Sequence, residues 1–166
     1  MLRWVVGVLV AMGLLAGAVP SSATSSSSKP VGAVLQVRRL LRTQASCSGW
    51  KSEPPAGKPV VLRVLDQPGL CYQLGVSDLT VQGLSAGVAK GAIGWVVNVG
   101  FNKAQDLACN RMAVRDVHKL VSVVVEGIAL DDPKLNIPIC PGGIQIGSDY
   151  ITRKDAERIA RELDPG

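Results

Sequence analysis

Apolar residues alternate with polar or small residues along several short segments of the chain, a pattern that is typical of strands burying one face. The segment WVVNVGF at 95–101 shows it most clearly, because alternate positions place four large side chains on one face: Trp95, Val97, Val99 and Phe101. The segment AVLQVRRLLR at 33–42 predicts another strand, with one face formed by Leu35, Val37 and Leu41. VVLRVL at 60–65 predicts a third strand.

Glycine, proline and branched residues divide the rest of the chain. LTVQGLSAGVAKGAIG at 79–94 is spaced by glycines and predicts a strand with a bend. LVSVVVEGIAL at 120–130 is rich in β-branched residues, so it predicts a strand with a turn at Glu126 and Gly127. The three prolines of DDPKLNIPICPGG at 131–143 exclude a central strand, and this segment is expected to be a loop.

Two segments begin with helix-start signals. Asn102 can cap a first helix while Gln105 reaches back to the cap, and this helix is expected to end near Arg115. Thr152 and Asp155 start a second helix in a similar way. The buried stripe of the second helix follows the spacing i, i+3, i+4, i+7: Ala156, Ile159, Ala160 and Leu163.

The charged residues of the second helix include Glu157 and Arg161, which are expected on its outer face in the favourable acid-before-base order. A short strand carrying Ile144 and Ile146 precedes this helix, so the order of elements is strands, helix, strands, helix. That order predicts an α+β domain: a mostly antiparallel β-sheet with two α-helices packed on one face.

The first residues have the layout of a secretory signal peptide, with one arginine, sixteen apolar residues and a small-residue cleavage site after Ala23. The predicted organisation is a signal peptide at 1–23, a Ser-rich flexible leader at 24–32 and a single domain at 33–166. An uncleaved anchor is the alternative, because sixteen residues fall just below the roughly 18–20 that span a membrane. No second apolar run of that length follows, so we expect a secreted or extracytoplasmic protein without transmembrane helices after cleavage.

The distribution of charge argues against nucleic acid as a partner. Without residues 1–23 the chain keeps 17 basic and 13 acidic residues, a net charge of +4. The basic residues are scattered and are not gathered into a stripe with interleaved aromatic residues, so nucleic acid is not an expected partner. Association with an anionic envelope surface stays open.

All four cysteines lie in the exported part: Cys47, Cys71, Cys109 and Cys140. An even number of cysteines in an oxidising compartment predicts two disulfides. The sequence permits three pairings, and nearest-neighbour closure favours Cys47–Cys71 with Cys109–Cys140. The spacings of 24, 38 and 31 residues lack the close ligand pairs of a metal site. A thiol nucleophile would need His118 as its base, and on one helix nine residues would place it opposite Cys109.

The candidates for catalysis are Asp131, Asp132 and His118. Adjacent aspartates before a proline are usually turn formers, and the single histidine is expected to be an ordinary surface or helix-end residue. We therefore expect no enzyme activity, no catalytic residue, no cofactor and no metal site. The sequence does not identify the binding residues.

From Gly94 to Gly166 the chain resembles the extracytoplasmic head domain of SecD, the membrane partner of the Sec protein-export channel. The resemblance follows a series of segments in order: WVVNVGF, AQDLACNRM, VSVVVEG, DDPKLNIPICPGG, GIQIGS and TRKDAERIARELDPG. Glu126 stands where the family usually has aspartate, and Cys109 stands where the family tends to have a large apolar residue. Residues 72–89 extend the resemblance towards the amino terminus.

The resemblance implies a head-like module that makes contacts and catalyses nothing. SecD couples proton flow to export through buried charges in its transmembrane helices, and that activity is not carried over to this chain. Three hypotheses follow. The first is a non-enzymatic exported module that contacts extended polypeptide or an envelope partner. The second is a membrane-anchored accessory of the Sec export machinery, and the third is a secreted hydrolase.

Overall fold

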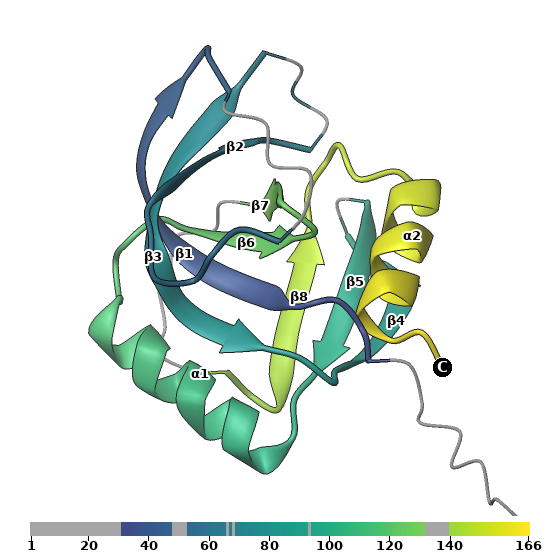
Figure 1. The fold of residues 1–166 in the computed structure, drawn as a ribbon. Coiled ribbons are helices and arrows are strands. Elements are labelled where there is room, and N and C mark those ends of the chain that lie inside the picture. Colours follow the sequence, from purple (N-terminus) through teal and green to yellow (C-terminus); the bar gives the residue numbers. More distant parts are fainter. Residues whose placement is uncertain (1–30, 48–52, 66, 68, 93, 132–139) are drawn as a thin grey trace, which may run out of the picture.

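The computed structural model describes residues 31–47, 53–65, 67, 69–92, 94–131 and 140–166 (Figure 1). The expected signal peptide, most of the expected leader and the segment 132–139 lie outside the described residues. The elements, in chain order, are β1 (Leu35–Gln44), β2 (Val60–Arg63), β3 (Cys71–Val81), β4 (Ser85–Lys90), β5 (Trp95–Gly100), α1 (Lys103–Arg115), β6 (Val121–Val125), β7 (Ile128–Asp131), β8 (Gly143–Gly147) and α2 (Arg153–Leu163).

The strands form two sheets, with the orders β2-β3-β1-β6-β7 and β4-β5-β8. All the neighbouring strands in these sheets are antiparallel. The α+β class with mostly antiparallel strands and two helices is thereby confirmed, while the division into two sheets differs from the single sheet we expected. Between β3 and β4, Gly83 has a φ of +67°, and the chain passes there from the first sheet to the second. The single bent strand expected at 79–94 is therefore two strands in different sheets.

The five-stranded sheet curls until its two outer strands meet. The residue after β2, Val64, forms a parallel bridge with Ala129 of β7, and the amide of Leu65 donates to the Ala129 carbonyl at 2.8 Å. The concave side encloses a small apolar cluster: Val60, Leu62, Val64, Tyr72, Leu74, Val124 and Ala129. Because β2 and β7 meet in this way, neither outer strand of the sheet has an open edge where the two are in contact.

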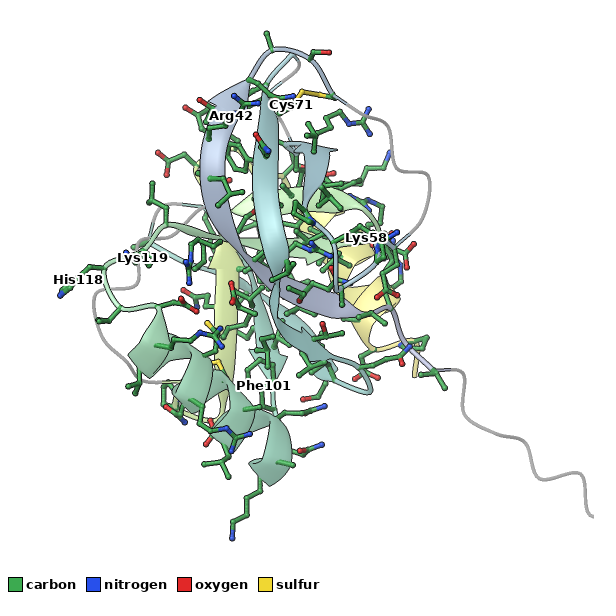
Figure 2. All side chains as sticks on the ribbon, turned by 60° about the vertical axis from the view of Figure 1, so that its left-hand side comes forward. Arg42, Lys58, Cys71, Phe101, His118 and Lys119 are labelled. Atoms are coloured by element: carbon green, nitrogen blue, oxygen red, sulfur yellow. A yellow bond between two sulfur atoms is a disulfide. The ribbon has the colours of Figure 1, made fainter. Side chains whose placement is uncertain are left out.

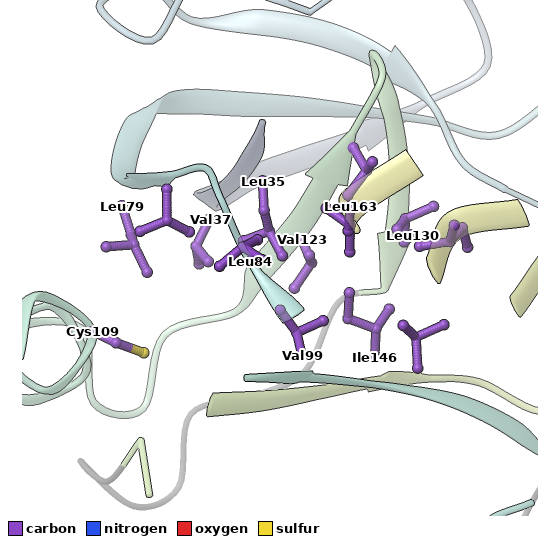
Figure 3. Packing of buried hydrophobic residues seen from close by; sticks show 14 of the residues in the cluster. Leu35, Val37, Leu79, Leu84, Val99, Cys109, Val123, Leu130, Ile146 and Leu163 are labelled. Atoms are coloured by element: carbon purple, nitrogen blue, oxygen red, sulfur yellow. The ribbon is translucent and has the colours of Figure 1, made fainter. Parts of the chain in front are cut away.

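The larger core lies between the two sheets, and both helices contribute to it. The first sheet supplies Leu35, Val37 and Val123, and these pack towards Val99 and Ile146 of the second (Figure 3). From α2 comes the predicted stripe, which is buried as expected: Ala156, Ile159, Ala160 and Leu163. That helix packs against β4 and β5, whereas α1 packs against β3.

Local signals predicted the turn and the caps well. Glu126 and Gly127 have φ values of 50° and 72° and join β6 to β7, as a tight hairpin with two left-handed residues requires. Asn102 and Gln105 form the expected capping box of α1, and the Thr152 side chain accepts a hydrogen bond from the amide of Asp155. The predicted helix starts and the turn are confirmed.

One expectation about a single side chain was wrong. Leu41 is 53% exposed, because the β1–β3 register shifts three times between Val37 and Arg42 and moves it off the face of Leu35 and Val37. Glu157 and Arg161 lie towards solvent, as expected, and Glu157 pairs with Arg153 at 2.8 Å, one turn towards the amino terminus.

Candidate functional site

The outer edge of β4 is the first candidate for a contact site. In the described part of the chain, β4 pairs only with β5, through six consecutive residue pairs without a register shift. Proline, a bulge or inward-pointing charges commonly protect such an edge, and β4 contains only one charged residue, Lys90 at its end. The edge is therefore regular and open to another strand.

The backbone hydrogen bond at the hairpin end shows which groups of β4 face outwards. The amide of Gly91 donates to the Gly94 carbonyl at 2.7 Å, which makes these two residues a hydrogen-bonded pair at the hairpin end. Because hydrogen-bonded and non-hydrogen-bonded pairs alternate in antiparallel strands, the N–H and C=O groups of three residues point away from β5: Ala86, Val88 and Lys90. These groups can pair with an added extended chain.

The hairpin end of this edge carries the positive charge of Lys90, whereas the nearby Arg153 is paired with Glu157. Lys90 lies opposite Trp95, and the guanidinium of Arg153 stands 5.3 Å from the centre of the Trp95 ring. A cation at this distance from an indole face is held by the ring quadrupole. An added strand would therefore meet positive charge at the hairpin end and apolar side chains, Ala86 and Val88, along its middle.

A groove beneath α1 is the second candidate. It has a volume of about 680 Å³ and lies between the helix, the face of β1 and β6, and the strands β5 and β8. Its inner walls are aliphatic: Val37, Val99, Met112, Val121, Val123 and Ile144. Figure 3 shows Cys109 reaching from α1 towards the side on which Val37 and Val99 lie.

A disulfide and hydrogen bonds hold α1 to the segment that closes the groove. The disulfide joins Cys109 to Cys140 with a Cα–Cα distance of 5.9 Å. The Asn110 side chain accepts from the Cys140 amide at 2.9 Å and donates to the Cys140 carbonyl at 3.4 Å, and Asp106 accepts from the Gly142 amide at 2.9 Å. These bonds fix the position of the helix at the mouth of the groove.

The second disulfide joins Cys47 to Cys71, so both bridges have the pairing that we expected from the sequence. It links an exposed residue just after β1 to the buried first residue of β3, at the upper end of Figure 2. No cysteine is free. One bridge joins the end of β1 to β3, and the other joins α1 to the segment before β8.

Of the three catalytic candidates, His118 is the one whose side chain the structure describes. His118 follows α1 with a φ of 65°, is exposed, and points away from the body of the protein (Figure 2). Asp131 ends β7, and Asp132 lies outside the described residues. Within the part of the chain that the structure describes, no group of three or more His, Cys, Asp or Glu side chains could hold a metal ion. No described helix is long and apolar enough to cross a membrane.

Two buried charged groups were missed by the sequence analysis. The Asp116 side chain is fully buried and accepts hydrogen bonds from Arg39 and from Arg115. Burial by itself raises the pKa of Asp116, but these hydrogen bonds outweigh burial and hold the pKa below its ordinary value. Arg115 also reaches Asp78 at 2.6 Å, so the cluster joins the end of α1 to β1 and β3. This arrangement is structural, since both acids are paired within the fold.

Arg38 is the other group, and it is fully buried in β1. All five of its N–H donors have acceptors, four of which are backbone carbonyls: Pro54, Pro55, Lys58 and Gly75. Burial lowers the pKa of Arg38, and nearby Glu53 and Asp78 oppose this shift. Arg38 therefore attaches the proline-rich loop to the sheet through three of its carbonyls. The only sequence signal for the burial of Arg38 was a charged residue inside an alternating strand.

Comparison with known proteins finds similarity at the level of structure. No family model matches the chain, and no curated protein matches it. One similar solved structure is described as a membrane component SecDF that enhances protein export; it has 19% identity and a TM-score of 0.56 over 81% of this chain and 63% of that one. Another, SecDF in a super-membrane-facing form, has 16% identity and a TM-score of 0.55 over 81% of this chain and 19% of that one.

This likeness confirms the SecD-like fold that the sequence motifs implied. The chain spans less than two thirds of the length of either solved structure. At such identities the likeness concerns the fold, and the activity of the longer proteins does not follow from it.

Proposed function

We propose that the domain is an extracytoplasmic, non-enzymatic module that contacts extended polypeptide through the open edge of β4. The observation that carries this proposal is the row of outward N–H and C=O groups at Ala86, Val88 and Lys90. An extended chain can pair with such an edge whatever its sequence, because the backbone supplies the hydrogen bonds. That property suits a protein that meets many different unfolded chains.

Two further findings support the proposal. The fold is similar to part of SecDF, which is described as a component that enhances protein export. Two disulfides fit an oxidising compartment, where exported chains are found before they fold. The basic hairpin end would raise the rate of encounter with acidic segments more than it would raise affinity.

The test is a substitution that removes one outward donor. Val88→Pro deletes the Val88 N–H, which points away from β5, and leaves the β4–β5 bonds in place. Its matched control is Val88→Thr, which keeps the N–H and nearly the same shape. Titration calorimetry with a reduced, carboxymethylated secreted polypeptide should show binding about tenfold weaker for Val88→Pro and within about twofold of the unmodified domain for Val88→Thr.

A triple variant of the catalytic candidates tests whether these residues take part in binding. Replacing His118 by alanine together with Asp131 and Asp132 by asparagine should leave the titration unchanged. Loss of binding in this triple variant, or no binding of any extended chain by the unmodified domain, would contradict the proposal.

A membrane-held accessory of the export machinery is the second candidate, favoured by the likeness to a membrane component. The state of residues 1–23 separates the two candidates. Cleavage after Ala23 would give a mature amino terminus at Thr24, and we expect mass spectrometry of the native protein to find it. Met1 on a membrane-bound form would favour the accessory.

A further inference from the structure

The groove beneath α1 arises from the small side chains on the inner face of that helix. Cys109 and Ala113 are fully or almost fully buried there, and Met112 is the only large side chain that α1 adds to the groove lining. Small residues at these positions leave space between the helix and the sheets. The resulting volume of about 680 Å³ lies within the range of about 300–1,000 Å³ that is usual for small-molecule sites.

The chemistry of the groove restricts what it can hold. Among the residues that the structure describes, those that line the groove are uncharged and none is aromatic. Its polar side chains include Asn98 and Gln145, which are both exposed, and Gln145 donates to Asn98 at 2.8 Å. These described lining residues supply aliphatic contacts, and none of them could pair with an ionic group or stack on a ring.

The groove is also resistant to widening. The Cys109–Cys140 bridge ties α1 to the segment at the mouth, and Asn110 and Asp106 add hydrogen bonds on either side of the bridge. A preformed apolar site binds with less loss of conformational freedom than one that must open. Because the helix is fixed, we expect room for one chain and not for two.

We propose that this groove binds one alkyl chain of a soluble single-chain amphiphile and leaves the polar head in water. The neutral lining matches an uncharged chain, and the flexible thioether of Met112 can adapt to its contour. This site is separate from the outward groups of β4 at Ala86, Val88 and Lys90, none of which lines the groove. The inference therefore stands whether or not β4 binds polypeptide.

The experiment fills the groove from opposite walls. Ala113→Leu adds bulk from α1 and Val121→Phe adds bulk from β6, and both residues line the groove. Val114→Leu is the matched control, because Val114 is adjacent on the same helix and 62% exposed. Titration calorimetry uses dodecanoate below its micelle concentration, at high salt so that the net positive charge is screened.

The unmodified domain should bind one dodecanoate per chain. Each filling variant should bind about tenfold more weakly or not at all, and Val114→Leu should bind within about twofold of the unmodified domain. Dodecyltrimethylammonium should bind as tightly as dodecanoate, since the head stays outside. Near-ultraviolet circular dichroism confirms that each variant is folded, and unaltered dodecanoate binding by either folded filling variant would overturn the proposal.

Two other outcomes would also overturn it. The first is no binding of dodecanoate by the unmodified domain below the micelle concentration. The second is binding to phospholipid vesicles alone, because that result would assign the interaction to a membrane surface and not to a single chain in the groove.

Discussion

Arg38 donates a hydrogen bond from Nε to Oε1 of Gln36 at 2.7 Å, and both side chains are fully buried in β1. Gln36 in turn donates to the Pro54 carbonyl at 2.8 Å and to the Glu53 carboxylate at 2.9 Å. Two neighbouring positions of one face of a strand thus hold a loop that begins seventeen residues later. Backbone dipoles stabilise this buried cation, and among the described residues no carboxylate bonds to it directly.

Arg38→Lys should destabilise the domain, because an ammonium group has three donors where the guanidinium has five. At least two buried acceptors would lose their partners, so we expect a loss of about 1–3 kcal/mol in the free energy of unfolding. Urea denaturation measures it. The amide of Ser77, which donates to the Ala56 carbonyl of the same loop, should exchange its hydrogen faster.

The control for this variant is Arg42→Lys on the exposed end of β1, where Arg42 bonds only the Gln73 side chain among its described partners. It should change stability by less than about 0.5 kcal/mol. Equal effects of the two substitutions would show that the buried network contributes nothing of its own.

We expect the contribution of Asp116 to the free energy of unfolding to be lost in acid. Its folded pKa lies below the ordinary value of 3.8, so its paired state stabilises the fold fully above that value. The contribution is lost as pH falls through 3.8 towards the lower folded pKa. Asp116→Asn should lower stability near neutral pH by about 1–3 kcal/mol, towards the lower end because Arg39 and Arg115 are 41% and 55% exposed.

Urea titrations at about pH 6, 4 and 2.5 check this prediction. The difference between the unmodified domain and Asp116→Asn should shrink as the pH falls, whereas the exposed substitution Asp149→Asn should show little difference at any pH. A difference that stays constant from neutral to acid would mean that the carboxylate charge is not what stabilises the site.

The Cys109–Cys140 bridge closes a loop of 31 residues, and removing it should cost about 3–4 kcal/mol. The double variant with both cysteines replaced by alanine should show this loss in thermal and urea unfolding. Peptide mapping of the unmodified protein should recover the 47–71 and 109–140 linkages and no free thiol. A peptide that links Cys71 to Cys109 would refute the pairing and leave the sheet topology intact.

The local sequence was sufficient to predict those elements whose signals lie within a few residues of one another. The capping box at Asn102 and Gln105 fixes where α1 begins, since both hydrogen bonds form between residues three apart. The turn at Glu126 and Gly127 and the apolar stripe of α2 are equally local. The motif series from Gly94 onwards also indicated the SecD-like fold, which the structural comparison then showed.

Tertiary structure decided what depends on distant partners. Alternation along a strand shows which residues share a face, but it does not say which sheet the strand joins, so the passage from β3 to β4 and the open edge of β4 could not be predicted. The burial of Arg38 requires carbonyls that lie up to 37 residues away, and the groove beneath α1 requires small helix residues to face strands at both ends of the chain. These features result from long-range packing, because burial and hydrogen-bond satisfaction depend on neighbours that only the folded chain brings together.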